Sequence, residues 1–158
     1  MVMGLGNTLN RDEGLGVHAL QALQAALTGA EGKLDAGLEF VDGGVLGLNL
    51  LPWVEASSHL LVLDAVNAGK APGTVIELAR DQIPLYSGIK LSDHQVTFQE
   101  VLGIAKFRGN LPPHLHLVGI QPADLSIGVA LSPLVQAAMS ELQARALAVL
   151  RQWGLLSD

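Results

Sequence analysis

The 158-residue chain has no cysteine, few aromatic residues (4%) and few charged residues (15%). Without cysteine, disulfide bonds, thiolate metal sites and a cysteine nucleophile are all excluded. The 9 lysine and arginine residues form no cluster and the formal net charge is -6, which argues against a nucleic-acid partner.

Long apolar runs and targeting segments are also missing. No uninterrupted apolar run reaches ~18 residues, the length that a membrane-spanning helix requires. The first residues lack the basic start and apolar stretch of a signal peptide. We therefore expect a soluble, cytoplasmic protein with no membrane insertion. Hydrophobic residues still make up 49% of the chain, and its length favours a single domain over residues 1–158.

Segments with strand and helix periodicity alternate along the chain. Strands are expected at residues 1–5, 38–41, 60–63, 74–78 and 115–120. Helices are expected at residues 14–27 and 46–56, from residue 92 onward, and from residue 133 to about residue 153. Ser92 with Gln95 fits a capping box, and Ser132 before Pro133 fits an N-cap. This order predicts an α/β fold, a three-layer α/β/α sandwich around a twisted, mostly parallel sheet of about five strands.

The most informative segment is a glycine-rich turn at residues 4–16 (GLGNTLNRDEGLG), between the first strand and the first helix. Turns of this kind usually bind phosphate through backbone N–H groups. Here Asp12 and Glu13 would repel a phosphate and attract a cation. The dinucleotide-binding fingerprint also fails, because its third glycine falls on Leu9. The segment therefore fits half of a cation or carboxylate site better than a nucleotide site.

Other polar residues follow the predicted strands, at the edge where open α/β sheets bind ligands. Asp42 ends the second strand, and Asp64 follows an apolar strand, where a carboxylate needs a partner or a metal. His94 is expected in the first turn of its helix, where the helix dipole favours a neutral, metal-binding imidazole. Glu13, Asp64 and His94 would offer two carboxylates and one imidazole, a set that suits nickel or zinc and leaves positions open for water or substrate.

Each of these residues also has a plain structural interpretation. Asp64 could cap the turn after its strand, and His94 could be a surface residue at a helix start. Asp12 and Glu13 could stabilise the helix N-terminus by their charge. Their shared position at one edge of the sheet favours a site, but the pattern alone leaves both interpretations open.

Other candidate motifs are weaker. His114 and His116 lie two apart on one face of a predicted strand and could bind a metal, although such a pair is more typical of half-solvated side chains. The sequence contains no His-Glu-x-x-His, no Gly-x-Ser-x-Gly and no Walker loop. No familiar hydrolase or nucleotide-binding motif therefore competes with the acidic site.

Five segments together resemble the [NiFe]-hydrogenase maturation endopeptidases, and they follow the family's order and spacing over nearly the whole chain. They are residues 4–16, residues 42–47 (DGGVLG), residues 63–65 with 72–74 (LDA, PGT), residues 92–102 (SDHQVTFQEVL), and residues 117–122 with 131–133 (LVGIQP, LSP). The surroundings of His94 most resemble the enzymes that serve uptake-type, membrane-bound hydrogenases. Two departures are Val45, where the family commonly has threonine, and a first strand with only three residues before Gly4.

The resemblance implies an endopeptidase that removes a short C-terminal peptide from the nickel-loaded precursor of a hydrogenase large subunit. It implies metal contacts for Glu13, Asp64 and His94, the same three residues that their positions selected, and a role in the same cleft for Asp42. The precursor is expected to supply the nickel, and another divalent metal could occupy the isolated protein. Cleavage would use water, because no serine, cysteine or threonine nucleophile stands out.

Several alternatives remain open from the sequence. Nickel in the precursor could dock on the three residues, a metal could polarise the carbonyl or activate water, or the carboxylates could act as acid and base. The chain could also be a non-enzymatic nickel- or precursor-binding maturation factor, or a peptidase with another protein substrate. We expect Trp53, Tyr86 and residues 82–90 to contribute to precursor docking, while Trp53 could instead pack in the core.

Overall fold

The computed structural model describes residues 1–29, 37–85 and 97–156. Within these residues, the chain forms a five-stranded sheet with the order β2-β1-β3-β5-β4. The strands are β1 (Val2–Leu5), β2 (Phe40–Gly44), β3 (His59–Ala65), β4 (Val75–Ala79) and β5 (His114–Ile120). Neighbouring pairs are parallel except for β4, which is antiparallel to β5. The prediction of a mostly parallel, five-stranded sheet is confirmed.

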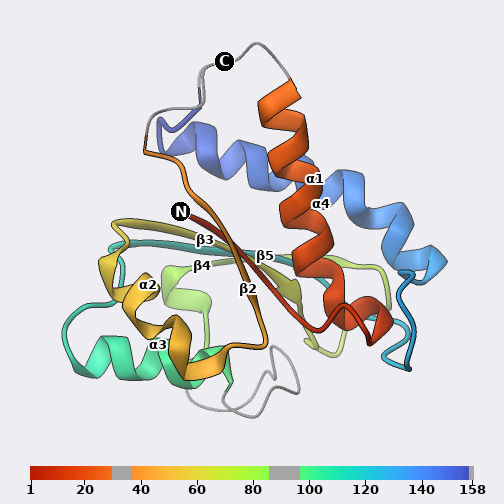
Figure 1. Cartoon of the computed structure of the whole chain (residues 1–158), viewed down its shortest axis with the longest axis horizontal. Helices are drawn as coiled ribbons and strands as arrows, with labels where there is room; N and C mark the ends of the chain where they lie inside the picture. The colour runs from red at the N-terminus through yellow and green to blue at the C-terminus, as the bar shows by residue number, and fades with distance from the viewer. Residues whose placement is uncertain (30–36, 86–96, 157–158) are drawn as a thin grey trace.

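Helices cover both faces of this sheet, with α1 and α4 on one side and α2 and α3 on the other (Figure 1). The α-helices are α1 (Leu15–Gly29), α2 (Leu51–Ala56), α3 (Phe98–Phe107) and α4 (Pro133–Gln152). Short 3-10 turns are η1 (Arg11–Gly14), η2 (Gly47–Leu50) and η3 (Arg80–Gln82). The predicted three-layer sandwich is therefore confirmed. No helix in the described ranges is both long and apolar enough to cross a membrane.

Two apolar clusters fill the spaces between the three layers. Leu61 and Leu63 of β3 belong to the cluster under α1 and α4, whereas Leu60 and Val62 belong to the cluster under α2 and α3. This division follows from the alternation of side chains along a strand. By the same alternation, Asp64 faces the α2 and α3 side.

Close contact between α1 and the sheet depends on glycine. A Cβ atom on Gly16 would lie 2.1 Å from the carbonyl oxygen of Leu63 and 2.4 Å from that of Leu5. Such distances are far inside van der Waals contact, so a side chain at this position would push the helix away from the sheet. Gly16 therefore allows the start of α1, and η1 before it, to lie against the carboxyl ends of β1 and β3.

The start of α3 differs from the prediction. The described helix begins at Phe98, after an extended Thr97 (φ -68°, ψ 148°) that acts as its N-cap. Thr97 Oγ1 accepts a hydrogen bond from the Glu100 N–H at 3.2 Å, and Glu100 Oε2 accepts one from the Thr97 N–H at 2.9 Å. Thr97 and Glu100 thus form the capping box that was expected at Ser92, a residue outside the described ranges.

The buried side of α3 is given by the residues that follow Thr97. Counted from Phe98, the buried positions include Val101, Leu102 and Ala105, whereas Ile104 is 37% exposed. Val101, Leu102 and Ala105 therefore belong to the buried side of α3, and Ile104 lies outside it.

The second strand also extends beyond its predicted end at residue 41. Asp42 pairs with Gly4, and Gly44 pairs with Leu5 after a shift in register. Although glycine usually weakens a strand, pairing with β1 keeps Gly43 and Gly44 within β2. Although β1 is short, its residues 2–4 have partners in both β2 and β3.

The histidines of β3 and β5 lie at the amino-terminal ends of these two strands. His59 and His114 stack with ring centroids 4.1 Å apart, and Trp153 meets His59 edge-on at 5.4 Å. His116 Nε2 lies 2.8 Å from Glu77 Oε1. Over the described residues, no group of three or more histidine, aspartate or glutamate side chains is placed to hold a metal ion. In the structure, His114 takes part in the ring stacking with His59, and His116 is in hydrogen-bond contact with Glu77.

Candidate functional site

Asp64 is the most unusual ionisable group at the carboxyl end of the sheet. It is 0% exposed, at the penultimate position of β3. Its Oδ1 accepts a hydrogen bond from the Ala65 N–H at 2.8 Å, whereas its Oδ2 is buried and has no hydrogen-bond partner among the described residues. Burial raises the pKa of Asp64 well above 3.8, the Ala65 hydrogen bond opposes this rise, and the charge of Glu13 adds to it.

Glu13 is placed near Asp64 by the turn η1. Its N–H donates to the carbonyl of Asn10 at 3.0 Å, and its side chain is partly buried. The charge of Glu13 raises the pKa of Asp64, so the two carboxyl groups interact electrostatically across the space between η1 and β3. The structure therefore brings together two of the three predicted metal-contacting residues.

His94, the third of these residues, lies outside the described residues, as does Tyr86. Three positions after His94 comes Thr97, the N-cap of α3, and α3 covers the face of the sheet toward which Asp64 points. The role of His94 therefore remains a prediction.

Asp42 lies apart from Asp64. Its register partner is Gly4, which in turn pairs with Leu63, so two strand spacings, about 10 Å, separate β2 from β3. Alternation along β2 places Asp42 on the α1 side of the sheet, opposite to Asp64. Its Oδ1 accepts a hydrogen bond from the Gly44 N–H at 3.0 Å. A role for Asp42 in the same cleft remains a prediction, and the described contact stabilises the turn.

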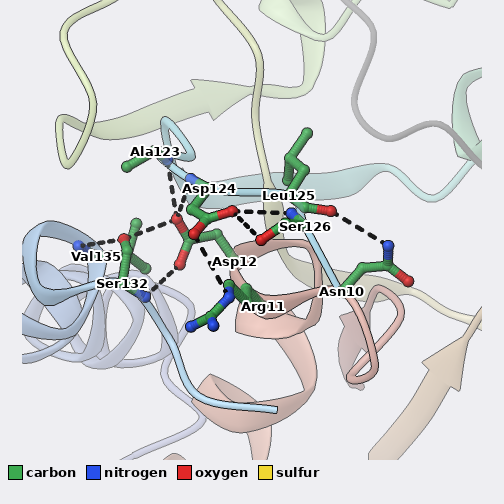
Figure 2. A network of polar contacts seen from close by, with 9 residues as sticks. All are labelled: Asn10, Arg11, Asp12, Ala123, Asp124, Leu125, Ser126, Ser132 and Val135. Carbon is green, nitrogen blue, oxygen red and sulfur yellow. Dashed lines mark hydrogen bonds and ion pairs between the residues drawn. The ribbon is translucent and has the colours of Figure 1, made fainter. Parts of the chain in front are cut away.

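Asp12 forms structural hydrogen bonds, although the sequence predicted that it would attract a cation together with Glu13. It is 0% exposed, and Figure 2 shows it within a network of donors from the loop that follows β5. Its Oδ2 accepts hydrogen bonds from the N–H groups of Ala123 and Asp124 at 2.9 and 2.8 Å. Ser132 donates from its hydroxyl to Oδ2 and from its N–H to Oδ1, both at 2.7 Å. These four bonds occupy the carboxylate, so Asp12 does not face an incoming cation.

We call this arrangement of Asp12 with Ala123, Asp124 and Ser132 the Asp12 latch. Sequence reasoning missed it because its partners lie 111 to 120 positions away from Asp12. The nearest local signal was Ser132, correctly predicted as the N-cap of α4, where its Oγ accepts from the Val135 N–H at 3.4 Å.

The structure describes only part of the surface that was expected to dock the precursor. Trp53 on α2 is 45% exposed, so the alternative that it packs in the core is not supported. Val45, in the turn after β2, is 57% exposed. Of the predicted rim segment at residues 82–90, only residues 82–85 belong to the described part of the chain.

Comparisons with known proteins agree with this fold. Residues 17–149 match the family model described as hydrogenase maturation protease. The chain is 39% identical over 157 residues to the hydrogenase expression/formation protein HupD of Rhodobacter capsulatus, covering 98% of this chain and 72% of that protein. It is 35% identical over 156 residues to the hydrogenase 2 maturation protease of Escherichia coli K12, covering 98% and 92% respectively.

Solved structures extend the comparison to three dimensions. The hydrogenase maturating endopeptidase HybD from E. coli superposes with a TM-score of 0.85 at 33% identity, covering 97% of this chain and 92% of that one. The [NiFe] hydrogenase maturation protease HybD from Thermococcus kodakarensis has a TM-score of 0.70 at 21% identity, covering 94% and 96%. The second similarity concerns the fold alone.

Proposed function

Because the chain belongs to the hydrogenase maturation protease family, we propose that it removes a short C-terminal peptide from the nickel-loaded precursor of a [NiFe]-hydrogenase large subunit. The resemblance to this family, predicted from five segments, is confirmed by the match over residues 17–149. We further propose that the precursor belongs to an uptake-type, membrane-bound hydrogenase and that it is cleaved in the cytoplasm.

The observation that carries the proposed site is the Oδ2 atom of Asp64, which is buried and has no hydrogen-bond partner within residues 1–29, 37–85 and 97–156. A buried carboxylate oxygen without a hydrogen-bond donor is costly unless it is protonated or bound to a cation. Glu13 adds a second carboxylate nearby, which increases the attraction for a cation and the cost of leaving both groups ionised.

The donor set fits nickel. Two carboxylate oxygens from Glu13 and Asp64, with an imidazole nitrogen from His94, form a set that a borderline divalent metal accepts. In our proposal these residues contact nickel that the precursor carries, so that the metal belongs to the substrate. Recognition of this nickel distinguishes a loaded precursor from an empty one, and water then hydrolyses the peptide bond to a carboxylate and an amine.

Cleavage of matched precursors tests this proposal. The purified protein is mixed with nickel-loaded and nickel-free forms of a cognate precursor, and the products are weighed by mass spectrometry. We expect only the loaded form to lose a C-terminal peptide. Glu13→Gln, Asp64→Asn and His94→Ala should impair this processing and leave the protein folded. Glu141→Gln, which removes an exposed carboxylate on α4, is the matched control and should process normally.

The alternatives give different results. Normal processing by all three site variants would refute the site assignment. Equal cleavage of both precursor forms would refute nickel recognition but would still support endopeptidase activity. Binding without cleavage would favour a non-enzymatic maturation factor, and cleavage of unrelated unfolded proteins would favour a peptidase with a different substrate.

A further inference from the structure

Large apolar side chains are exposed on two loops beside the candidate site. Leu9 lies in the loop after β1, and Leu125, Ile127 and Val129 lie in the loop after β5. Their exposed fractions are 63%, 43%, 86% and 69%, respectively. We call these four residues the apolar edge. Exposed apolar groups gathered in this way mark interaction surfaces more often than scattered ones do.

Hydrogen bonds hold the two loops together. The Arg11 N–H donates to the carbonyl of Gly128 at 2.8 Å, and the Gly128 N–H donates to the carbonyl of Leu9 at 2.9 Å. Asn10 Nδ2 donates to the carbonyl of Leu125 at 3.2 Å, as Figure 2 shows. These bonds fix the backbone of the two loops relative to each other, while the side chains of the apolar edge are exposed to solvent.

The Asp12 latch fixes the apolar edge relative to the candidate site. Asp12 binds Ala123, Asp124 and Ser132 on both sides of the loop after β5, and Glu13 is the next residue in the chain. A substrate segment that approaches Glu13 along the loop after β5 therefore passes beside the apolar edge.

The lack of charged residues in the loop after β5 indicates which kind of partner surface can bind there. Residues 125–134 contain no charged residue, although the whole chain carries a formal charge of -6. Asp124, just before this segment, lies 3.4 Å from Arg11 Nε, so these two charges compensate one another. A complementary partner surface is therefore apolar and uncharged.

We propose that the apolar edge binds an apolar, uncharged segment of the hydrogenase precursor that adjoins the peptide bond to be cut. The proposal rests on the proposed function, which supplies the precursor as the occupant. A second copy of this chain seated on the apolar edge would stand beside the approach to Glu13 and obstruct the substrate, so the precursor is the better occupant. Binding here aligns the substrate because the Asp12 latch joins the docking surface to the turn that carries Glu13.

Charge insertion at the most exposed position tests the proposal. Ile127→Glu places a carboxylate on the apolar edge without removing a buried contact, and Phe107→Glu makes the same kind of change at the end of α3. Phe107 is 90% exposed and is the last residue of α3, distant in sequence from both loops of the apolar edge, which makes it a matched control. The Kd for the nickel-loaded precursor is measured by calorimetry, and KM and kcat are measured from the released peptide.

We expect Ile127→Glu to raise Kd and KM by about tenfold or more and to leave kcat within about twofold. Phe107→Glu should change none of the three. An unchanged Kd and KM in Ile127→Glu, with active wild type, would overturn the docking proposal alone. A wild-type dimer that Ile127→Glu converts to a monomer without raising KM would assign the apolar edge to a second copy and would also overturn it.

The binding measurement separates this proposal from the proposed function. If the wild type binds the precursor without cutting it, the endopeptidase is refuted, and a tenfold loss of affinity in Ile127→Glu still supports docking. If the wild type does not bind a cognate, nickel-loaded precursor, both proposals are overturned.

Discussion

Asp12 accepts two hydrogen bonds from Ser132, one from the backbone N–H to Oδ1 and one from the hydroxyl to Oδ2, each 2.7 Å long. Ser132 is also the N-cap of α4, where its Oγ accepts from Val135. One serine therefore joins the start of the last helix to the turn beside the candidate site. Because Asp12 is fully buried, its four hydrogen bonds from Ala123, Asp124 and Ser132 take the place of hydration by water.

Asp12→Asn should weaken folding strongly. Asparagine keeps one acceptor oxygen, and its amide N–H groups would point at the N–H donors of the loop, leaving buried groups unpaired. We expect the free energy of unfolding in urea to fall by about 3 kcal/mol, within the range for buried hydrogen bonds to charged groups. Asp81→Asn, at a side chain that is 95% exposed, is the control and should change it by less than about 0.5 kcal/mol. Equal stability of the two variants would contradict a structural latch.

Gly16→Ala should separate α1 from the sheet. The added Cβ would meet the Leu63 carbonyl oxygen at 2.1 Å, and backbone atoms cannot move aside as a flexible side chain can. We expect a loss of about 3 kcal/mol or more in unfolding free energy, at the upper end of overpacking effects. Gly37→Ala provides the matched control, because a Cβ there has nothing within 4 Å. A stable Gly16→Ala variant would refute the close approach of α1 to β3.

The fold was largely predictable because local patterns specify it. The run at residues 60–63 is apolar on both faces, as a central strand must be, and it became the middle of β3. The boundary of α3 was missed because Ser92 and Thr97 are both followed three residues later by Gln or Glu, so two capping boxes compete in the sequence. In the structure Thr97 is the N-cap of α3, and Val101 and Ala105 of this helix are buried.

The candidate site was predictable only in part. Glu13 and Asp64 could be paired because both follow strands that end at the same edge of the sheet. Asp12 is adjacent to Glu13 and chemically similar, yet its role depends on Ser132, a contact across 120 positions that no local pattern encodes. The places of Glu13 and Asp64 therefore follow from topology, whereas the role of Asp12 follows from tertiary packing.

Thr97→Ala should destabilise α3. The substitution removes the side-chain acceptor for the Glu100 N–H and half of the capping box. We expect the unfolding free energy to fall by about 1 kcal/mol, the usual value of an N-cap. Ser140→Ala, at an exposed position inside α4, should be neutral or slightly stabilising because alanine favours helix. If both variants unfolded like the wild type, Thr97 would not be the functional N-cap.

Asp64 should make the stability of the metal-free protein depend on pH. Burial, and secondarily the charge of Glu13, raise its folded-state pKa above the ordinary value of 3.8. Between the unfolded and folded pKa values the folded state binds more protons, so the unfolding free energy falls as pH rises. The contribution from Asp64 is therefore complete below about pH 4 and is lost as the pH passes through the folded pKa.

Asp64→Asn removes this titration, because an amide does not ionise in that range. In the presence of a chelator, we expect the unfolding free energy of Asp64→Asn minus that of the wild type to increase from about pH 4 upward, by at most about 1.4 kcal/mol per pH unit. Glu13→Gln removes the like charge that opposes ionisation of Asp64. The unfolding free energy of this variant should therefore decrease less between about pH 4 and neutral pH than that of the wild type. Urea titrations at several pH values measure both effects, with Asp81→Asn as an exposed-carboxyl control. A difference that stays constant with pH would mean that Asp64 ionises in the folded protein as it does in water, and a buried cation-binding oxygen at this position would then be untenable.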